Sequence, residues 1–170
     1  METTITDSYA GFWARTAAYF IDGAILAFLV LHSNWLMREQ LTDFLDSHPD
    51  LLKSIESHFT LTGSADYELK YLIIGTIMYY YLVFMGFLIS WMYFAGMESS
   101  PLRATVGKWI LGIYVTDSNG NRISFTKATG RFFGKMVSGA LFGIGYIMAG
   151  VTERKQGLHD MMADCLVWRK

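Results

Sequence analysis

Charge, cysteine and proline are scarce in this chain, and the scarcity of charge is the most informative of the three. Of its 170 residues, 17% are charged and 52% are hydrophobic, and the mean hydropathy is +0.28. Soluble domains carry about 25% charged residues, so the composition indicates an integral membrane protein whose first partner is the lipid bilayer. The single cysteine, Cys165, excludes an intrachain disulfide, and a net charge of −1 provides no basic field for nucleic acid.

Three apolar stretches divide the chain. Residues 71–97 contain no charged residue, so this segment is the clearest membrane span, and we place the span at 71–95. A first span is expected over about 16–37, close to the roughly 20 residues that a bilayer demands. The third stretch, 132–152, is rich in glycine and is free of charge only from residue 136. It is either a short span or a re-entrant segment shielded from lipid.

The distribution of Lys and Arg helps to choose between these arrangements. With the N-terminus inside, a third crossing divides the 14 basic residues seven to seven, whereas a re-entrant segment puts eleven inside and three outside. The positive-inside rule favours the second division. We therefore expect a multi-pass protein of the plasma (bacterial inner) membrane. Both termini are then cytoplasmic, residues 38–70 are extracytoplasmic, and residues 98–127 form a cytoplasmic loop.

The cytoplasmic loop contains one further predicted element. Residues 112–125, GIYVTDSNGNRISF, place alternating apolar residues around an Asp-Ser-Asn-Gly turn, which predicts a small β-hairpin. The predicted fold class is thus an all-α membrane protein, a single domain over 1–170. It has two full transmembrane helices, a third glycine-rich segment and a small cytoplasmic hairpin. On that third segment Gly139, Gly143 and Gly150 share nearly one helix face, which would let another helix approach in a homo-oligomer.

Two charged residues interrupt the first apolar stretch. Arg15 and Asp22 are seven residues apart, so they project from one helix face, but about 10 Å separates them along the axis. If the third segment turns back, Asp160 in the tail becomes the expected partner of Arg15, with Arg131 nearer to Asp22. Charges in a span mark a partner or a wet cavity. Two interpretations stay open: an ion or proton site, or a structural network that joins the termini.

Other polar residues are candidates for the same site. Tyr80 belongs to a triplet of tyrosines near the middle of the second span, and one of these hydroxyls should find an acceptor, with Asp22 as the candidate. Asp164 lies one helical turn beyond Asp160, so a helical tail would point both carboxylates the same way.

Residues typical of catalysis or metal binding are not arranged in a recognisable pattern. His159 has no second histidine at metal-site spacing, so we expect a polar tail residue and no metal. The sequence shows no nucleophile–base pair and no His-Glu-x-x-His element, so we expect neither an enzyme nor a cofactor.

Three separate stretches resemble one family. AGFWARTAAYFIDG, ATVGKWILGIYVTDSNGNRISFTKATGR and RKQGLHDMMADCLV are similar to signature segments of the RDD family, small membrane proteins named for one arginine and two aspartates. The resemblance places that arginine on Arg15 and the aspartates on Asp22 and Asp160. The family's Thr-x-Gly-Lys element and later arginine fall on Thr105, Gly107, Lys108 and Arg131. The run Ala163-Asp164-Cys165 departs from the family's usual Ala-Gly-Thr and adds an acidic group beside the site.

The resemblance implies an integral membrane protein for which transport of a cation or a solute has been proposed, while other relatives look like accessory subunits. We therefore expect a small oligomeric transporter of a monovalent cation, a proton or another solute, with Asp22 as the titrating group. The alternative is a non-catalytic scaffold that binds another membrane protein through residues 34–66 or the 98–127 loop.

Overall fold

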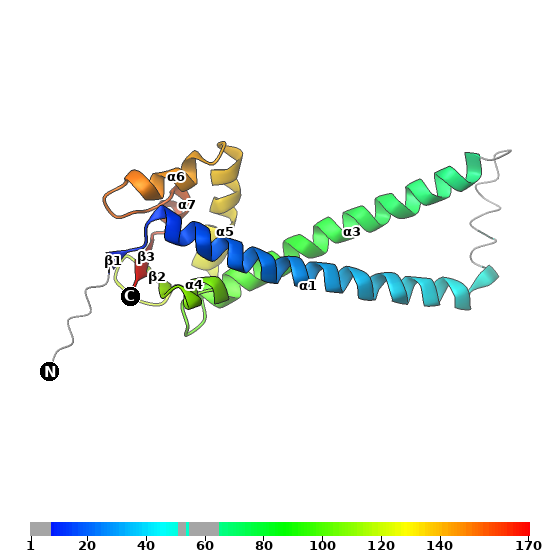
Figure 1. Ribbon diagram of the computed structural model, residues 1–170, viewed down its shortest axis with the longest axis horizontal. Coiled ribbons are helices and arrows are strands. Elements are labelled where there is room, and N and C mark those ends of the chain that lie inside the picture. Colours follow the sequence, from blue (N-terminus) through cyan, green and yellow to red (C-terminus); the bar gives the residue numbers. More distant parts are fainter. Residues whose placement is uncertain (1–7, 51–53, 55–64) are drawn as a thin grey trace. The chain divides into compact units, whose positions relative to one another are not determined.

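The computed structural model describes residues 8–50, 54 and 65–170, which divide into two compact units. The terminal unit combines the chain up to Leu26 with Ile89–Lys170, and the central unit is Ala27–Leu88. The elements in chain order are β1 (Ser8–Tyr9), α1 (Phe12–Ser47), α3 (Ala65–Glu98), α4 (Val106–Ile110), β2 (Ile113–Asp117), α5 (Phe125–Ala140), α6 (Ile144–Val151), α7 (Leu158–Met162) and β3 (Cys165–Arg169) (Figure 1).

Two of the described helices are long and apolar enough to cross a membrane. The qualifying stretches are Phe12–Leu41 within α1 and Met78–Glu98 within α3. Helix α1 continues to Ser47, about ten residues beyond the predicted end of the first span. In the central unit the two helices touch where Val30 packs on Gly86. The predicted fold class, a mostly helical membrane protein with two spans, is confirmed.

A small antiparallel sheet brings together three distant parts of the chain. Its strand order is β1-β3-β2, so the C-terminal strand lies between the N-terminal strand and the strand that follows α4 (Figure 1). The core below it consists of small and β-branched residues without exposed surface: Ala10, Ala18, Ala95, Ile113, Val115, Ile123, Ala128, Cys165 and Val167. Burial of these side chains is the main favourable term for this unit.

The predicted hairpin over 112–125 is only half correct. Strand β2 and the turn after it form as expected, with the Asp117 carboxylate accepting from the backbone of Asn119 and Asn121. The partner of β2 is β3, however, and not the segment after the turn. Two local features redirect that segment: the Ile123 side chain is buried in the core, and the Ser124 hydroxyl accepts from Lys127 as the N-cap of α5.

The third apolar stretch is a bent helix pair. Helices α5 and α6 meet at 103° across a break at residues 141–143, as a broken span or a re-entrant loop would. Phe142 at the bend is 97% exposed. The prediction that Gly139, Gly143 and Gly150 share one helix face is wrong, because the break separates Gly139 from Gly150. Nothing lies within 4 Å of a Cβ added at Gly139 or Gly143, whereas Gly150 lies against Phe12.

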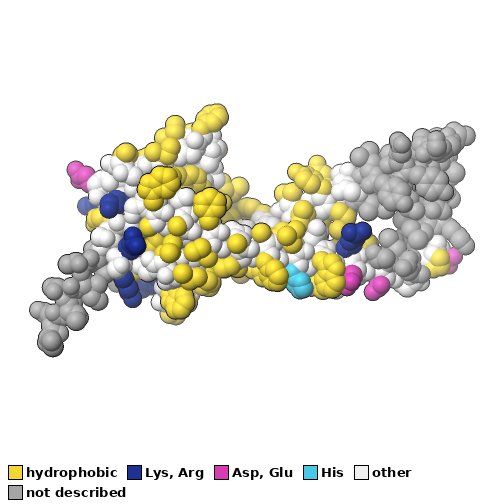
Figure 2. Space-filling model, viewed as in Figure 1, with side chains coloured by type: hydrophobic (Ala, Val, Ile, Leu, Met, Phe, Trp, Pro, Cys, Tyr) yellow, Lys and Arg dark blue, Asp and Glu magenta, His cyan; other side chains and the backbone are white. Residues whose placement is uncertain are grey.

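Exposed apolar side chains cover much of the terminal unit. Hydrophobic side chains gather over the visible face of α1, and Lys and Arg gather near the sheet (Figure 2). Helix α5 is amphipathic: its inward face carries Ala128, Arg131, Gly134 and Ser138, and its outward face carries exposed apolar residues such as Phe133 and Met136. Large exposed apolar surfaces mark contact with lipid or another protein.

The close approach of α5 and α6 depends on Gly145. A Cβ at this position would lie 2.6 Å from both Cβ and Oγ of Ser138. We expect Gly145→Ala to lower the free energy of unfolding by about 1–3 kcal/mol through overpacking. The matched control is Gly139→Ala, also in a helix but in open space, which should raise stability by up to about 1 kcal/mol. Denaturant unfolding in detergent micelles measures both, and equal effects would contradict this packing.

Candidate functional site

Arg15 lies in the first turn of α1 and ties both ends of the chain together. Its Nε donates to the carbonyl of Ala10 at 2.8 Å, and its Nη2 donates to the carbonyl of Lys155 at 2.5 Å. Its Nη1 forms an ion pair with the Asp160 carboxylate. The expected pairing of Arg15 with Asp160 is therefore present.

Asp160 also binds a second arginine, which lies on α5. Arg131 donates from Nε to Asp160 Oδ1 at 2.7 Å and from Nη1 to Glu98 Oε2 at 2.6 Å. The backbone N–H of Gly157 donates to the other oxygen of Asp160 at 3.0 Å. The sequence placed Arg131 nearer to Asp22, and this is wrong, since its ion pairs are with Asp160 and Glu98.

Glu98, the last residue of α3, forms ion pairs with two lysines in addition to Arg131. Lys108 Nζ lies 2.6 Å and Lys135 Nζ 3.3 Å from the same Oε1 atom. Lys135 also lies over the ring of Phe94, 4.2 Å from its centroid, where a cation–π attraction holds it. We call this set the charge cluster: Arg15, Glu98, Lys108, Arg131, Lys135 and Asp160.

The charge cluster is unbalanced. It contains four basic side chains and two carboxylates. Both carboxylates, Glu98 and Asp160, are buried. Lysine has three N–H donors and arginine five, so several donors remain after both carboxylates are saturated. Buried charges are stable only when they are paired, and the surplus here is therefore the chemically informative part of the site.

Asp22 stands apart from the charge cluster, because three neutral donors bind it. The Tyr93 hydroxyl and the Gly107 backbone N–H each donate to Oδ1 at 2.7 Å, and the Thr105 hydroxyl donates to Oδ2 at 2.6 Å. Gly107 must be glycine, since a Cβ there would lie 2.3 Å from the Ala18 carbonyl. The Thr-x-Gly-Lys element thus docks its loop on α1.

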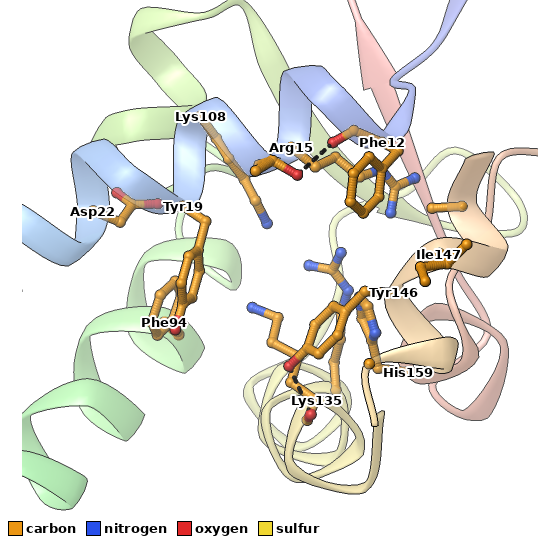
Figure 3. A pocket seen from close by; sticks show the side chains of 14 residues that line it. Phe12, Arg15, Tyr19, Asp22, Phe94, Lys108, Lys135, Tyr146, Ile147 and His159 are labelled. Carbon is orange, nitrogen blue, oxygen red and sulfur yellow. Dashed lines mark hydrogen bonds between the residues drawn. The ribbon is translucent and has the colours of Figure 1, made fainter. Parts of the chain in front are cut away.

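The four basic side chains of the charge cluster line a pocket in the terminal unit. The basic pocket has a volume of about 430 Å³, within the range of small-molecule sites. Lys108 and Arg15 approach it from one side and Lys135 from the other, and the ring of Tyr146 lies beside Lys135, with Tyr19 and Phe94 at the left of the view (Figure 3). Its lining residues are Phe12, Arg15, Thr16, Tyr19, Asp22, Phe94, Lys108, Arg131, Lys135, Gly143, Tyr146, Ile147, Ala149 and His159.

Burial shifts the proton affinities of the groups on α4 and α7. Burial alone would raise the pKa of Asp160, but Arg131 and Arg15 hold that pKa below its usual range. Burial, helped by the charge of Arg131, lowers the pKa of Lys108 to about 7 even though Glu98 opposes the shift. Asp160 therefore stays ionised, whereas Lys108 gains and loses its charge near neutral pH.

His159 is a buried residue, so its prediction as a polar tail residue is wrong. Its Nδ1 lies 3.3 Å from Ser138 Oγ, and its Nε2 lies 3.4 Å from Asp160 Oδ1. This order resembles a Ser-His-Asp triad, but Ser138 Oγ also lies 2.9 Å from the carbonyl of Gly134 and is closed off by Gly145. Burial lowers the pKa of His159 to about 3, so the ring is neutral.

Two predicted site residues lie elsewhere. Tyr80 is 66% exposed in the central unit, and the tyrosine that serves Asp22 is Tyr93. Asp164 does not share a face with Asp160, because α7 ends at Met162 and the chain then turns. Its exposed carboxylate accepts from Ser118 and Lys127 instead.

Sequence reasoning missed Glu98, the central acceptor of the charge cluster. A signal existed, since Glu98 is the first charged residue after the uncharged run 71–97 and ends a span. Within the described part of the chain, no three His, Cys, Asp or Glu side chains are grouped to hold a metal ion.

Asp160 should dominate stability. Asp160→Asn leaves two buried guanidinium groups without their shared anion, so we expect the free energy of unfolding to fall by roughly 3–5 kcal/mol. Asp164→Asn is the matched control and should cost under about 0.5 kcal/mol, because its carboxylate is exposed. Denaturant titration in micelles gives both values, and similar losses would contradict a central role for Asp160.

The Asp160 carboxylate also predicts how the stability of the protein changes with acid. Because the native pKa of Asp160 lies below its unfolded value, its stabilising contribution is complete above the unfolded pKa and is lost as pH falls toward the native one. Thermal unfolding of Asp160→Asn should accordingly vary less between pH 3 and pH 6 than that of the parent protein.

Comparison with known proteins identifies the family of this chain. The model of the RDD family matches residues 9–164. The uncharacterized protein YxaI of Bacillus subtilis (strain 168) is 31% identical over 153 residues, covering 90% of this chain and 92% of that relative. The uncharacterized membrane protein YteJ of the same organism is 29% identical over 169 residues, covering 96% and 82%. No solved structure matches. The chain belongs to the RDD family of membrane proteins.

Proposed function

We propose that this membrane protein is a transporter of an anionic solute and that the basic pocket is its binding site. The observation that carries the proposal is the excess of basic side chains around one pocket: four line it, against the three carboxylates of Asp22, Glu98 and Asp160. In a site shielded from water such a surplus attracts anions strongly. Lys and Arg with spare N–H donors are also the side chains that bind phosphate and carboxylate.

The contacts of the carboxylates favour an anion over the monovalent cation or proton expected from the sequence. Asp160 and Glu98 are each held by two or more basic groups, and Asp22 accepts from Tyr93, Thr105 and Gly107. A cation at any of them would have to displace donors that are already in place and would meet like charges nearby.

The bent helix pair supports transport over a purely structural role. Gly143, at the break between α5 and α6, lines the pocket. Transporters commonly build solute sites where membrane helices are interrupted. We propose that the protein acts without catalysis and without a cofactor. The Ser138 hydroxyl, which lies next to His159, is buried against Gly145 and is not accessible as a nucleophile.

We further propose a topology with two crossings and a re-entrant α5–α6 pair. The shared sheet of β1, β2 and β3 supports this topology, in which the N-terminus, the loop after α3 and the C-terminus lie on the same side. Eleven of the 14 basic residues then fall on that side, which the positive-inside rule makes cytoplasmic.

Cysteine labelling tests this topology. Cys165 itself is buried, so a Cys165→Ser background is needed. Asn119→Cys and Lys170→Cys, both exposed, should react with a membrane-impermeant maleimide only after the inner face is opened. Ser47→Cys, at the end of α1, should react from outside in intact cells. Labelling of positions 119 and 170 from opposite sides would overturn the shared-side arrangement.

Anion binding should depend on the surplus lysines. Inorganic phosphate should raise the melting temperature of the purified protein, because a ligand that binds only the native state stabilises it. Lys135→Gln should weaken this effect about tenfold or more in concentration, whereas Lys127→Gln, outside the pocket and exposed, should leave it unchanged. Stabilisation by Na⁺ or K⁺ and not by phosphate would favour the cation hypothesis.

Binding of an anion whose charge is constant in this range, such as sulfate, should weaken as pH rises from 6 to 8. Lys108 has a pKa of about 7 and faces Glu98 from α3 and Arg131 and Lys135 from α5. As pH rises through 7 it loses its charge, and the surplus that attracts the anion falls. Lys108→Arg keeps the charge and should flatten this profile. Phosphate binding without flux in proteoliposomes would contradict transport and favour the scaffold alternative, whose 34–66 surface lies partly outside the described residues.

A further inference from the structure

The basic pocket lies at the ends of both candidate spans. Arg15 is in the first turn of the stretch Phe12–Leu41, and Glu98 is the last residue of the stretch Met78–Glu98. The Lys108 side chain comes from the short helix that follows the second stretch. If these helices cross the bilayer, all three side chains lie at the boundary between hydrocarbon and water, which is the depth of lipid phosphates.

The donors left over in the pocket suit a phosphate. Lys108 and Lys135 share a single oxygen of Glu98, so each ammonium retains N–H donors for another acceptor. Arg131 donates to the carboxylates of Asp160 and Glu98, whereas Arg15 donates from Nε and Nη2 to backbone carbonyls. Clustered lysine and arginine side chains are the usual partners of phosphate oxygens.

The rim of the pocket is apolar and exposed, which a small hydrophilic anion does not explain. Tyr19 on α1 and Ile147 on α6 both line the pocket, yet they are 60% and 56% exposed. Figure 3 shows these two side chains on opposite sides of the opening. Further exposed apolar residues follow on the same helices: Phe20, Ile144 and Val151. A bare phosphate would also fill only a small part of the 430 Å³.

We propose that the anion bound in the basic pocket is the phosphate headgroup of a membrane lipid, with its acyl chain leaving past Tyr19 and Ile147 along the apolar surfaces of α1 and α6. This inference rests on the proposed anion site and narrows its ligand to an amphiphile. The charge cluster binds the headgroup, and the rim contacts the first carbons of the chain. Burial of apolar chain surface at the rim adds affinity that a free phosphate cannot gain.

Native mass spectrometry of the full-length protein in a neutral detergent tests the inference. The probes are phosphatidate, phosphatidylcholine with the same chains, and water-soluble glycerol 3-phosphate. We expect phosphatidate to bind one to one, at least tenfold more tightly than either of the other two. Lys135→Gln should reduce phosphatidate binding at least tenfold, whereas Lys127→Gln should not change it.

A rim variant separates the chain from the headgroup. Ile147→Gln is exposed and should fold. It should weaken phosphatidate binding severalfold and leave glycerol 3-phosphate binding unchanged. Equal binding of glycerol 3-phosphate and phosphatidate, or equal binding of phosphatidylcholine, would overturn the lipid inference and leave the anion site standing. If neither phosphatidate nor glycerol 3-phosphate binds, the proposed anion function fails as well.

Discussion

The pairing of Asp160 with two guanidinium groups is the interaction on which the terminal unit depends. It connects α1 through Arg15, α5 through Arg131 and the tail through its own helix α7. Moving such ions out of water costs several kcal/mol each, so the arrangement is stable only with every member present. Backbone carbonyls of Ala10 and Lys155 take the donors that the carboxylate cannot. The helices are therefore positioned by charge as much as by their apolar faces.

Asp22 has a different task, although it shares a helix with Arg15. Its three donors come from Tyr93, Thr105 and Gly107, which fixes the loop before α4 against α1. That contact determines where Lys108 enters the charge cluster. Because these donors are neutral, Asp22 takes no basic side chain away from the charge cluster. The basic side chains of the pocket form their ion pairs with Glu98 and Asp160 instead.

The sequence predicted the spans and the Arg15–Asp160 pair because both follow from rules that act along the whole chain, namely hydrophobic length and the distribution of basic residues. It did not predict which tyrosine serves Asp22, because α3 is apolar on all sides and its pattern defines no inward face. The partner of β2 was missed for a related reason. Local alternation identifies a strand, but pairing with a segment about fifty residues away depends on the fold.

The central position of β3 has a consequence for how the protein is made. During synthesis β3 emerges after β1, Arg15 and β2, because it follows them in the chain. Until the tail arrives, Arg15 lacks the carboxylate of Asp160, Arg131 has that of Glu98 alone, and β1 and β2 lack the strand between them. The nascent protein must therefore hold an incomplete charge cluster beside an unfinished sheet, and a chain that stops short of residue 160 can complete neither the cluster nor the sheet.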